Sequence, residues 1–125
     1  MAFFANSKFV EELTPDDFDE RERWRLKRKR CCIVLFYLRE CPHCIAVKEV
    51  WRKLAERAAF YDVCAFDAAS YPEYTNALRN DMPGLIKGYP TMIIYERGEL
   101  KENYVGPRTV TDLTNALMRS CSSSN

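Results

Sequence analysis

The sequence predicts an α/β domain with a central mixed β-sheet of about five strands, flanked by about four helices. Two continuous apolar runs, Cys31 to Leu38 and Tyr61 to Phe66, are typical of central strands buried on both faces. The segment between them, Ile45 to Ala58, has helical periodicity, and a helical crossover makes the two strands parallel. A later apolar run, Met92 to Tyr95, precedes a hairpin turn signal at Glu96 to Glu99, so the end of the sheet is expected to be antiparallel.

Before the first apolar run, the sequence predicts a short strand and a helix. Lys8 to Leu13 could form the strand. Thr14 has the side chain of a helix N-cap, Pro15 suits the first helical position, and acidic residues follow near the positive end of the helix dipole. The helix is expected to end in the basic run Arg25 to Arg30, at its negative end. Three of its apolar side chains would face the core: Phe18, Trp24 and Leu26.

The basic run Arg25 to Arg30 has an alternative interpretation as a nuclear address or a polyanion-binding patch. We favour the plainer interpretation of a solvated helix end that leads into a strand. The formal net charge of +1 gives no argument for a nucleic-acid partner. No apolar run reaches the length of a bilayer span, so we expect no membrane span.

The second half of the chain predicts a short helix, the hairpin and a last helix. Tyr71 to Leu78 is the short helix, and Asn80 to Gly84 breaks it. Leu100 to Val105 is the antiparallel return strand of the hairpin. The last helix starts at Thr109 or Thr111, and its buried stripe is expected to contain Val110, Leu113, Leu117 and Met118.

We expect one domain over residues 1–125, with frayed tails at 1–7 and 121–125. Met1 to Asn6 is too short and lacks the basic flank of a signal peptide, and residues 122–125 form no retention address. The expected location is therefore the cytoplasm, with an oxidising compartment or a viral particle as alternatives.

The six cysteines do not have the placement of a disulfide scaffold. Cys31, Cys32 and Cys64 lie inside apolar strand-like runs, where a free thiol packs as a small apolar side chain. A regulatory role is the alternative for these three. Cys121 is expected at the exposed end of the last helix, where an intermolecular disulfide is the alternative to no role. The remaining two cysteines form the expected redox pair in a reducing compartment.

That pair lies in the motif Cys41-Pro42-His43-Cys44, at the junction of a predicted strand and a predicted helix. Unpaired N–H groups and the dipole at a helix start favour a thiolate, so Cys41 is the expected attacking nucleophile. Pro42 suits the first helical position, and His43 favours the thiolate further when it is protonated. Cys44, one turn inside the helix, would be more buried and would resolve a mixed disulfide.

Two plainer interpretations of the motif stay open. Cys41 and Cys44 could form a structural disulfide or remain inert thiols. A metal site at Cys41, His43 and Cys44 would need a fourth ligand, and none is evident in the chain. A cluster shared between two chains is the remaining metal alternative. We therefore expect neither a metal nor a cofactor.

Several separated motifs resemble the thioredoxin family, and within it the catalytic domains of protein disulfide isomerases. Leu13 to Phe18 is similar to the family segment that opens its first helix. Cys41 to Cys44 has the redox motif at the expected place, although its central dipeptide resembles that of the bacterial oxidase DsbA. Gly88 to Thr91 resembles the cis-proline loop, and Tyr104 to Thr109 resembles the isomerase branch. The resemblance covers roughly residues 8–120.

The resemblance implies the thioredoxin fold and thiol–disulfide exchange with protein disulfide or dithiol substrates. It implies that Gly88, Tyr89 and Pro90 position the substrate, with a cis bond before Pro90. Cis bonds are the minor state of X–Pro bonds, so this one would be a specific feature of the site. Electrons would come from, or pass to, an external reductase or glutathione. The direction of reaction, whether reductase, oxidase or isomerase, stays open.

The residue before the first cysteine departs from the family. Thioredoxins and isomerases usually have tryptophan there, whereas this chain has Glu40. A carboxylate beside Cys41 would oppose its thiolate and would remove an aromatic docking surface. Arg39 is expected to offset this charge.

The second departure lies under the motif. The family buries an acid six residues before the first cysteine, and its isomerase branch pairs that acid with a lysine on the next strand. Here the two positions are Leu35 and Ala65, so no uncompensated buried charge results. Cys44 would then lack its usual base, with water or Arg108 as a substitute, and we expect slow release of mixed disulfides.

These departures support an alternative function, a redox-weak binding module that holds clients in the same groove. A further alternative is a structural protein of a virus or an organelle that passes disulfides to its neighbours.

Overall fold

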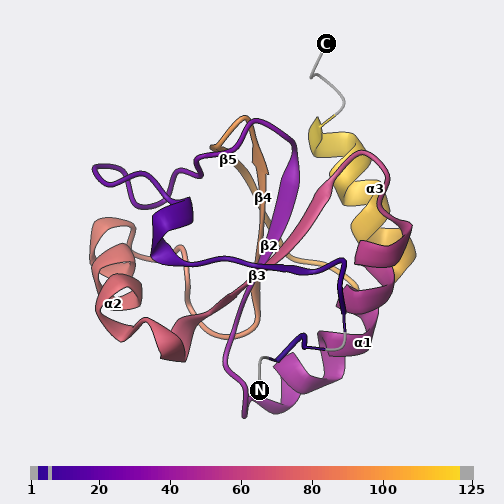
Figure 1. Ribbon diagram of the computed structural model, residues 1–125, viewed down its shortest axis with the longest axis horizontal. Helices are drawn as coiled ribbons and strands as arrows, with labels where there is room; N and C mark the ends of the chain where they lie inside the picture. Colours follow the sequence, from indigo (N-terminus) through magenta and orange to yellow (C-terminus); the bar gives the residue numbers. More distant parts are fainter. Residues whose placement is uncertain (1–2, 6, 122–125) are drawn as a thin grey trace.

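The computed structural model describes residues 3–5 and 7–121 (Figure 1). Its elements follow the order β, β, α, β, α, β, β, α, with two additional 3₁₀ turns. Their bounds are β1 Glu11–Glu12, a 3₁₀ turn Pro15–Asp17, β2 Cys32–Tyr37, α1 Pro42–Arg57, β3 Asp62–Asp67, a 3₁₀ turn Ala68–Ser70, α2 Pro72–Asp81, β4 Thr91–Glu96, β5 Glu99–Tyr104 and α3 Val110–Cys121.

The five strands form one mixed sheet in the order β1-β3-β2-β4-β5. The first three strands in this order are parallel, and β4 and β5 are antiparallel to their neighbours. Helices α1 and α3 cover one face of the sheet and α2 covers the other (Figure 1). The predicted α/β class and mixed five-stranded sheet are confirmed, but the described residues form three helices and two 3₁₀ turns rather than about four helices. None of these helices combines the length and apolar character that a membrane span requires.

Strand β2 is the centre of the core because all six of its residues are buried. Its side chains alternate between the two faces of the sheet, as the pleat requires. Ile33, Leu35 and Tyr37 join the cluster under α1 and α3, whereas the other three join the cluster under α2. On the first face, the fully buried Trp51 of α1 donates a hydrogen bond from its indole N–H to the carbonyl of Cys64 at 2.9 Å.

The predicted helix from Thr14 to the basic run is wrong, because only its first turn forms. The expected cap is present: the Asp16 N–H donates to the Thr14 hydroxyl at 3.2 Å. The chain then leaves the helix at Phe18, which pairs with Leu26 in an isolated antiparallel bridge. Between them, the Asp19 carboxylate accepts backbone N–H bonds from two following residues, a local contact that competes with helix formation. Phe18 and Leu26 are both buried, as expected, but they belong to a loop and not to a helix.

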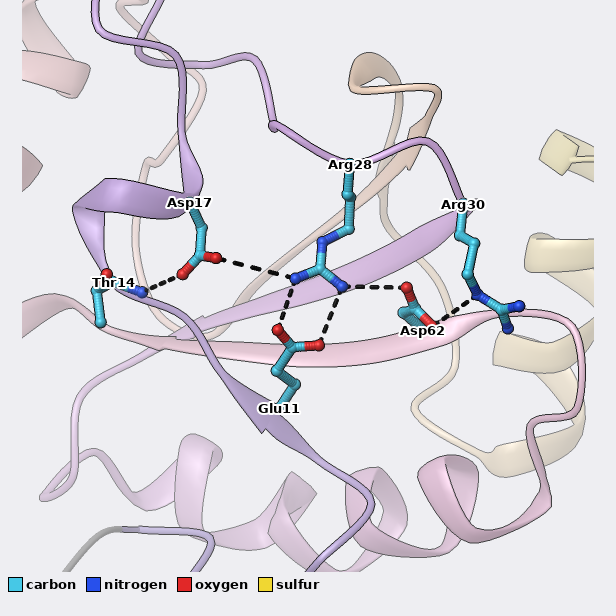
Figure 2. A network of polar contacts seen from close by, with 6 residues as sticks. All are labelled: Glu11, Thr14, Asp17, Arg28, Arg30 and Asp62. Carbon is cyan, nitrogen blue, oxygen red and sulfur yellow. Dashed lines mark hydrogen bonds and ion pairs between the residues drawn. The ribbon is translucent and has the colours of Figure 1, made fainter.

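The end of the basic run is held against the sheet by ion pairs (Figure 2). Arg28 makes a two-pronged contact with Glu11 of β1, at 2.7 and 3.0 Å, and a bond to Asp62 of β3 at 3.0 Å. Arg30 binds the other oxygen of Asp62 at 2.8 Å, and Asp17 lies 4.0 Å from Arg28. These arginines therefore join the loop to two strands, which supports an intramolecular role rather than a polyanion-binding one.

A disulfide joins Cys31 and Cys121, which are 90 positions apart in the sequence and whose Cα atoms lie 6.1 Å apart. It joins the residue before β2 to the last residue of α3. The expectation of a free Cys31 and an exposed Cys121 is wrong, because α3 packs along the sheet and brings its end to β2, where Cys121 is buried. Cys32 and Cys64 are buried free thiols, as predicted.

The ends of the chain are more ordered than predicted where the structure describes them. Phe3 and Phe4 are buried, and their rings lie 4.5 and 5.8 Å from that of Tyr37. The frayed N-terminal tail is therefore wrong at these residues. Helix α3 includes Cys121, whereas the rest of the predicted C-terminal tail, 122–125, lies outside the described residues. In the α3 stripe Met118 is exposed, and the buried residues are Leu113, Ala116, Leu117 and Cys121.

Replacing Gly98 by alanine is expected to destabilise the fold by roughly 2–3 kcal/mol. Gly98 has a φ of +82° in the turn between β4 and β5, and an added Cβ would clash with the carbonyl oxygen of Leu26. Urea unfolding would measure the loss. Gly88→Ala is the matched control, because a Cβ there meets nothing within 4 Å. Equal stability of the two variants would contradict this account of the turn.

Candidate active site

The predicted redox motif lies at the start of α1. Cys41 is the N-cap residue, and Pro42 takes the first helical position, where its missing N–H costs nothing. Cys44 lies one turn inside the helix. Its side chain is fully buried in the cluster under α1 and α3, whereas Cys41 is partly exposed and His43 is exposed. A substrate can therefore reach the first sulfur directly but not the second.

The surroundings of Cys41 favour its thiolate. Burial by itself would raise its pKa, but hydrogen bonds from the Cys44 thiol and from the backbone N–H groups of Cys44 and His43 outweigh burial. The positive charge of Arg108 acts in the same direction, so the pKa of Cys41 lies below its ordinary value. His43 thus contributes through its backbone, whereas the sequence predicted a contribution from its imidazole.

The surroundings of Cys44 have the opposite effect. Burial, and after it the neighbouring Cys41, raise the pKa of its thiol to about 11. A hydrogen bond involving the backbone of Leu38 and the charge of Arg108 oppose this rise without cancelling it. At neutral pH the two sulfurs are therefore chemically distinct: one is prepared to attack and the other holds its proton.

The bond between Tyr89 and Pro90 is cis, as predicted. The loop places the Tyr89 carbonyl beside the motif, and the Cys41 thiol donates a hydrogen bond to it at 3.5 Å. The Thr91 hydroxyl donates to the Gly88 carbonyl at 2.6 Å and fixes the loop from inside. The structure therefore brings the loop of Gly88, Tyr89 and Pro90 to Cys41, with Tyr89 in direct contact.

Arg39, predicted to offset the charge of Glu40, forms an ion pair with another carboxylate. Its Nε lies 2.8 Å from the carboxylate of Asp67, at the end of β3. Glu40 itself is exposed and takes part in no ion pair among the described residues. The other predicted accessory residue, Arg108, is exposed and close enough for its charge to lower the pKa of both motif cysteines.

A third acidic residue, Glu12, was not predicted from the sequence. The register places Glu12 of β1 beside Ala65 of β3, and Ala65 beside Leu35 of β2, so the three side chains lie in one row on the same face. The Tyr37 hydroxyl donates to the Glu12 carboxylate at 2.7 Å. Only the register between strands distant in sequence could have identified this acid.

Burial raises the pKa of Glu12 above its ordinary value of 4.5, and the charge of Asp67 raises it further, against the hydrogen bond from Tyr37. A proton on Glu12 therefore stabilises the folded state below about pH 4.5, and this contribution is lost as the pH rises through the raised pKa. Glu12→Gln keeps an acceptor for Tyr37 and should remove this loss. Urea unfolding between about pH 4 and pH 8 would measure it.

The control for the Glu12 prediction is Glu20→Gln, which changes an exposed carboxylate in the N-terminal loop. It should leave the pH profile of the wild type unchanged. If Glu12→Gln also follows the wild-type profile, burial of this carboxyl does not influence folding.

Two cavities adjoin the motif. One, of about 630 Å³, is lined by residues at the C-terminal ends of β2 and β3, including Arg39, Glu40, Cys41 and Asp67. The other, of about 470 Å³, runs along the cis-proline loop and the end of β5, and includes Lys87 and Arg108. Both are open to solvent and have no lining residue in common, so a substrate chain crossing Cys41 has a depression available on either side.

The comparisons with known proteins agree with this geometry. The family model described as Thioredoxin matches residues 9–119. The chain belongs to the thioredoxin family. Within the thioredoxin family it is 30% identical over 109 residues to the mouse protein named Protein disulfide-isomerase A6, an alignment that covers 87% of this chain and 24% of that protein. Family members of this kind are thiol–disulfide oxidoreductases.

Further relatives include the protein disulfide-isomerase of Humicola insolens, 34% identical over 83 residues, which is 65% of this chain and 16% of that protein. Bloodstream-specific protein 2 of Trypanosoma brucei brucei is 29% identical over 106 residues, covering 82% of this chain and 19% of that protein. The chain therefore spans a quarter or less of the curated thioredoxin-family relatives it matches.

Solved structures show the same fold. The Trx4 domain of ERdj5 aligns with a TM-score of 0.69 at 22% identity, covering 89% of this chain and 94% of that one. The J-Trx1 fragment of ERdj5 gives 0.71 at 19% identity, over 94% of this chain and 54% of that one. Human ERp44 gives 0.69 at 18% identity, over 95% of this chain and 30% of that one. The fold assigned from the sequence is thus confirmed.

Proposed function

We propose that this chain is a thiol–disulfide oxidoreductase that exchanges disulfides with protein substrates through Cys41 and Cys44. The observation that supports it is the asymmetry of the pair. Cys41 is accessible and has a lowered pKa, whereas Cys44 is buried and has a pKa of about 11. A nucleophile that attacks first and a partner that waits with its proton are what two-step exchange requires.

In the reductive direction, the Cys41 thiolate attacks one sulfur of a substrate disulfide. A bond forms between Cys41 and that sulfur, and the other substrate sulfur leaves as a thiolate that takes a proton from water. Cys44 then loses its proton to water and attacks the Cys41 sulfur, which releases the second substrate sulfur as a thiolate. Two electrons pass to the substrate, and Cys41 and Cys44 end as a disulfide. An external reductase or glutathione reduces this disulfide; oxidation of a substrate is the reverse sequence.

The loop of Gly88, Tyr89 and Pro90 positions the substrate in this proposal. The Tyr89 carbonyl already accepts a hydrogen bond from Cys41, so its backbone faces the reacting sulfur. An extended substrate strand can pair with exposed backbone of this kind, which fixes its cysteine without reading its side chains.

The test is the equilibrium of the Cys41/Cys44 pair in glutathione redox buffers, read by alkylation mass shifts. A midpoint near about −270 mV would mark a reductase, and one between about −180 and −120 mV an isomerase or an oxidase. The Cys44→Ser variant should accumulate a mixed disulfide with a reporter protein because it cannot release its substrate. The double variant Cys41→Ser/Cys44→Ser is the control and should accumulate none. A pair that never exchanges, with nothing trapped, would exclude this function.

A second candidate is a binding module that holds clients in the same groove with weak redox activity. Three residues favour it: Glu40 replaces an aromatic neighbour of the motif, and Leu35 and Ala65 make the surroundings of Cys44 apolar. Binding of an unfolded client that is unchanged in Cys41→Ser, together with a pair that does not exchange, would support it.

We infer an oxidising compartment rather than the cytoplasm expected from the sequence. The support is the disulfide between Cys31 and Cys121, a type of link that persists outside reducing compartments. Blocking free thiols in intact cells that make the protein, followed by mass determination, would test this inference. If Cys31 and Cys121 are both alkylated, the protein resides in a reducing compartment.

A further inference from the structure

We propose that the charges beside the substrate's cysteine select the substrate: one neighbour is basic and faces Glu40, and the other is acidic and faces Lys87 and Arg108. This inference rests on the proposed exchange function and specifies its substrate class. It follows from the two cavities that adjoin the attacking cysteine, which have charges of opposite sign.

The first cavity, which we call the Glu40 cavity, has Cys41 in its wall. Its other charged lining residues are Arg39, Glu40 and Asp67. Arg39 and Asp67 bind one another at 2.8 Å, so their charges offset each other. Glu40 is exposed and has no ion-pair partner among the described residues, which gives the cavity a net negative charge.

The second cavity, which we call the Lys87 groove, has the opposite charge. Its charged lining residues are Lys87 and Arg108, both exposed, and no acidic residue lines it. Neither cation is in an ion pair within the part of the chain that the structure describes. Val105, which is 91% exposed, lines the same groove and adds an apolar contact.

The two cavities meet at the contact between Cys41 and Tyr89. Cys41 lines the Glu40 cavity, Tyr89 lines the Lys87 groove, and the Cys41 sulfur lies 3.5 Å from the Tyr89 carbonyl oxygen. A strand that places its sulfur on Cys41 therefore extends toward a negative charge in one direction and toward two positive charges in the other. Its residues on either side of the cysteine face opposite charges.

Each charge pair is expected to change the rate of exchange only modestly, but the free-energy contributions of the two pairs add. A favourable charge pair at an exposed position changes an equilibrium by only a few-fold, and salt screens it. Two such pairs, compared with two repulsive ones, predict roughly a tenfold difference in the rate of exchange at low salt. In about 1 M salt, where the screening length falls to a few ångströms, the difference should disappear.

The experiment uses four short peptides, each with one cysteine joined by a disulfide to neutral 2-mercaptoethanol. The residues two positions before and after the cysteine are lysine and glutamate, glutamate and lysine, two lysines, or two glutamates. We expect one of the two oppositely charged peptides to react roughly tenfold faster than the other, with the like-charged pair between them. Glu40→Lys and Lys87→Glu should each lower this ratio severalfold, and together they should invert it.

Ratios between peptides cancel any effect of Glu40→Lys on the reactivity of Cys41 itself. Lys53→Glu is the matched control, because it reverses the charge of an exposed lysine on α1 that lines neither cavity, and it should leave the ratio unchanged. Neutral bis(2-hydroxyethyl) disulfide separates the two hypotheses. If the protein does not exchange with it, the proposed function fails. If it does, but the four peptides react within twofold of one another, the charge selection alone is overturned.

Discussion

In the fully reduced protein, Cys41 is expected to react with iodoacetamide at pH 7 at least roughly tenfold faster than Cys44. Burial raises the pKa of Cys44 to about 11, whereas the hydrogen bonds to Cys41 hold its pKa below the ordinary value of a thiol. At pH 7 a much larger fraction of Cys41 is therefore thiolate. Thiolates of higher pKa are more nucleophilic, but this offsets only about half of the advantage on a logarithmic scale. Full burial of Cys44 increases the preference further.

Peptide mass spectrometry after timed alkylation would give the rate at each cysteine separately. Cys32 and Cys64 are buried free thiols far from the helix start and act as slow internal references. In Cys41→Ser, Cys44 should stay as slow as these references, and the variant should neither reduce nor form disulfides. Equal alkylation rates at Cys41 and Cys44 would mean that the asymmetry, and with it the two-step order of attack, does not exist in solution.

Breaking the disulfide between Cys31 and Cys121 is expected to lower the free energy of unfolding by about 4–5 kcal/mol. The two residues are 90 positions apart, so the link closes most of the chain into one loop in the unfolded state. Constraint of a loop of that length corresponds to about 4.6 kcal/mol in the chain-entropy description. A loss of this size is a large fraction of the stability of an ordinary domain, which is about 5–15 kcal/mol.

The measurement is urea unfolding of Cys41→Ser/Cys44→Ser, with and without reductant. This variant keeps Cys31–Cys121 as its only disulfide, so any effect of reduction belongs to that bond. A second variant, which also has Cys31→Ala and Cys121→Ala, should be insensitive to reductant. A change below about 1 kcal/mol on reduction would show that the link does not restrict the unfolded chain.

The parts of this protein that could be predicted from the sequence are those encoded locally. Three features each occupy a few consecutive residues whose chemistry dictates their structure: the apolar run of β2, the motif from Cys41 to Cys44 and the loop around Pro90. The free, buried state of Cys32 and Cys64 followed in the same way from their apolar neighbours.

The errors arose where residues distant in sequence decide the outcome. In place of the predicted N-terminal helix, Phe18 pairs with Leu26 in a bridge and the Asp19 side chain binds the backbone of the loop between them. The periodicity of apolar residues along the sequence gives no information on such contacts across a loop. The partner of Cys31 could not be read from the chain, since Cys121 reaches it only once α3 has packed on the sheet. The ion pair of Arg39 with Asp67 was likewise not predicted, because Asp67 lies on a different strand end.

The apolar row of Leu35 and Ala65 affects the rate at which a substrate is released rather than the stability of the fold. Capture of a substrate needs only the Cys41 thiolate, which is formed at the surface, so its rate is set by that exposed group. Release requires Cys44 to lose its proton. Cys44 lies in an apolar cluster, and the nearest acid in the row of Leu35 and Ala65 is Glu12, two strands away from β2. A protein that captures quickly and releases slowly spends most of each cycle covalently joined to its client. Under the proposed function, the domain would act as a tether during that time.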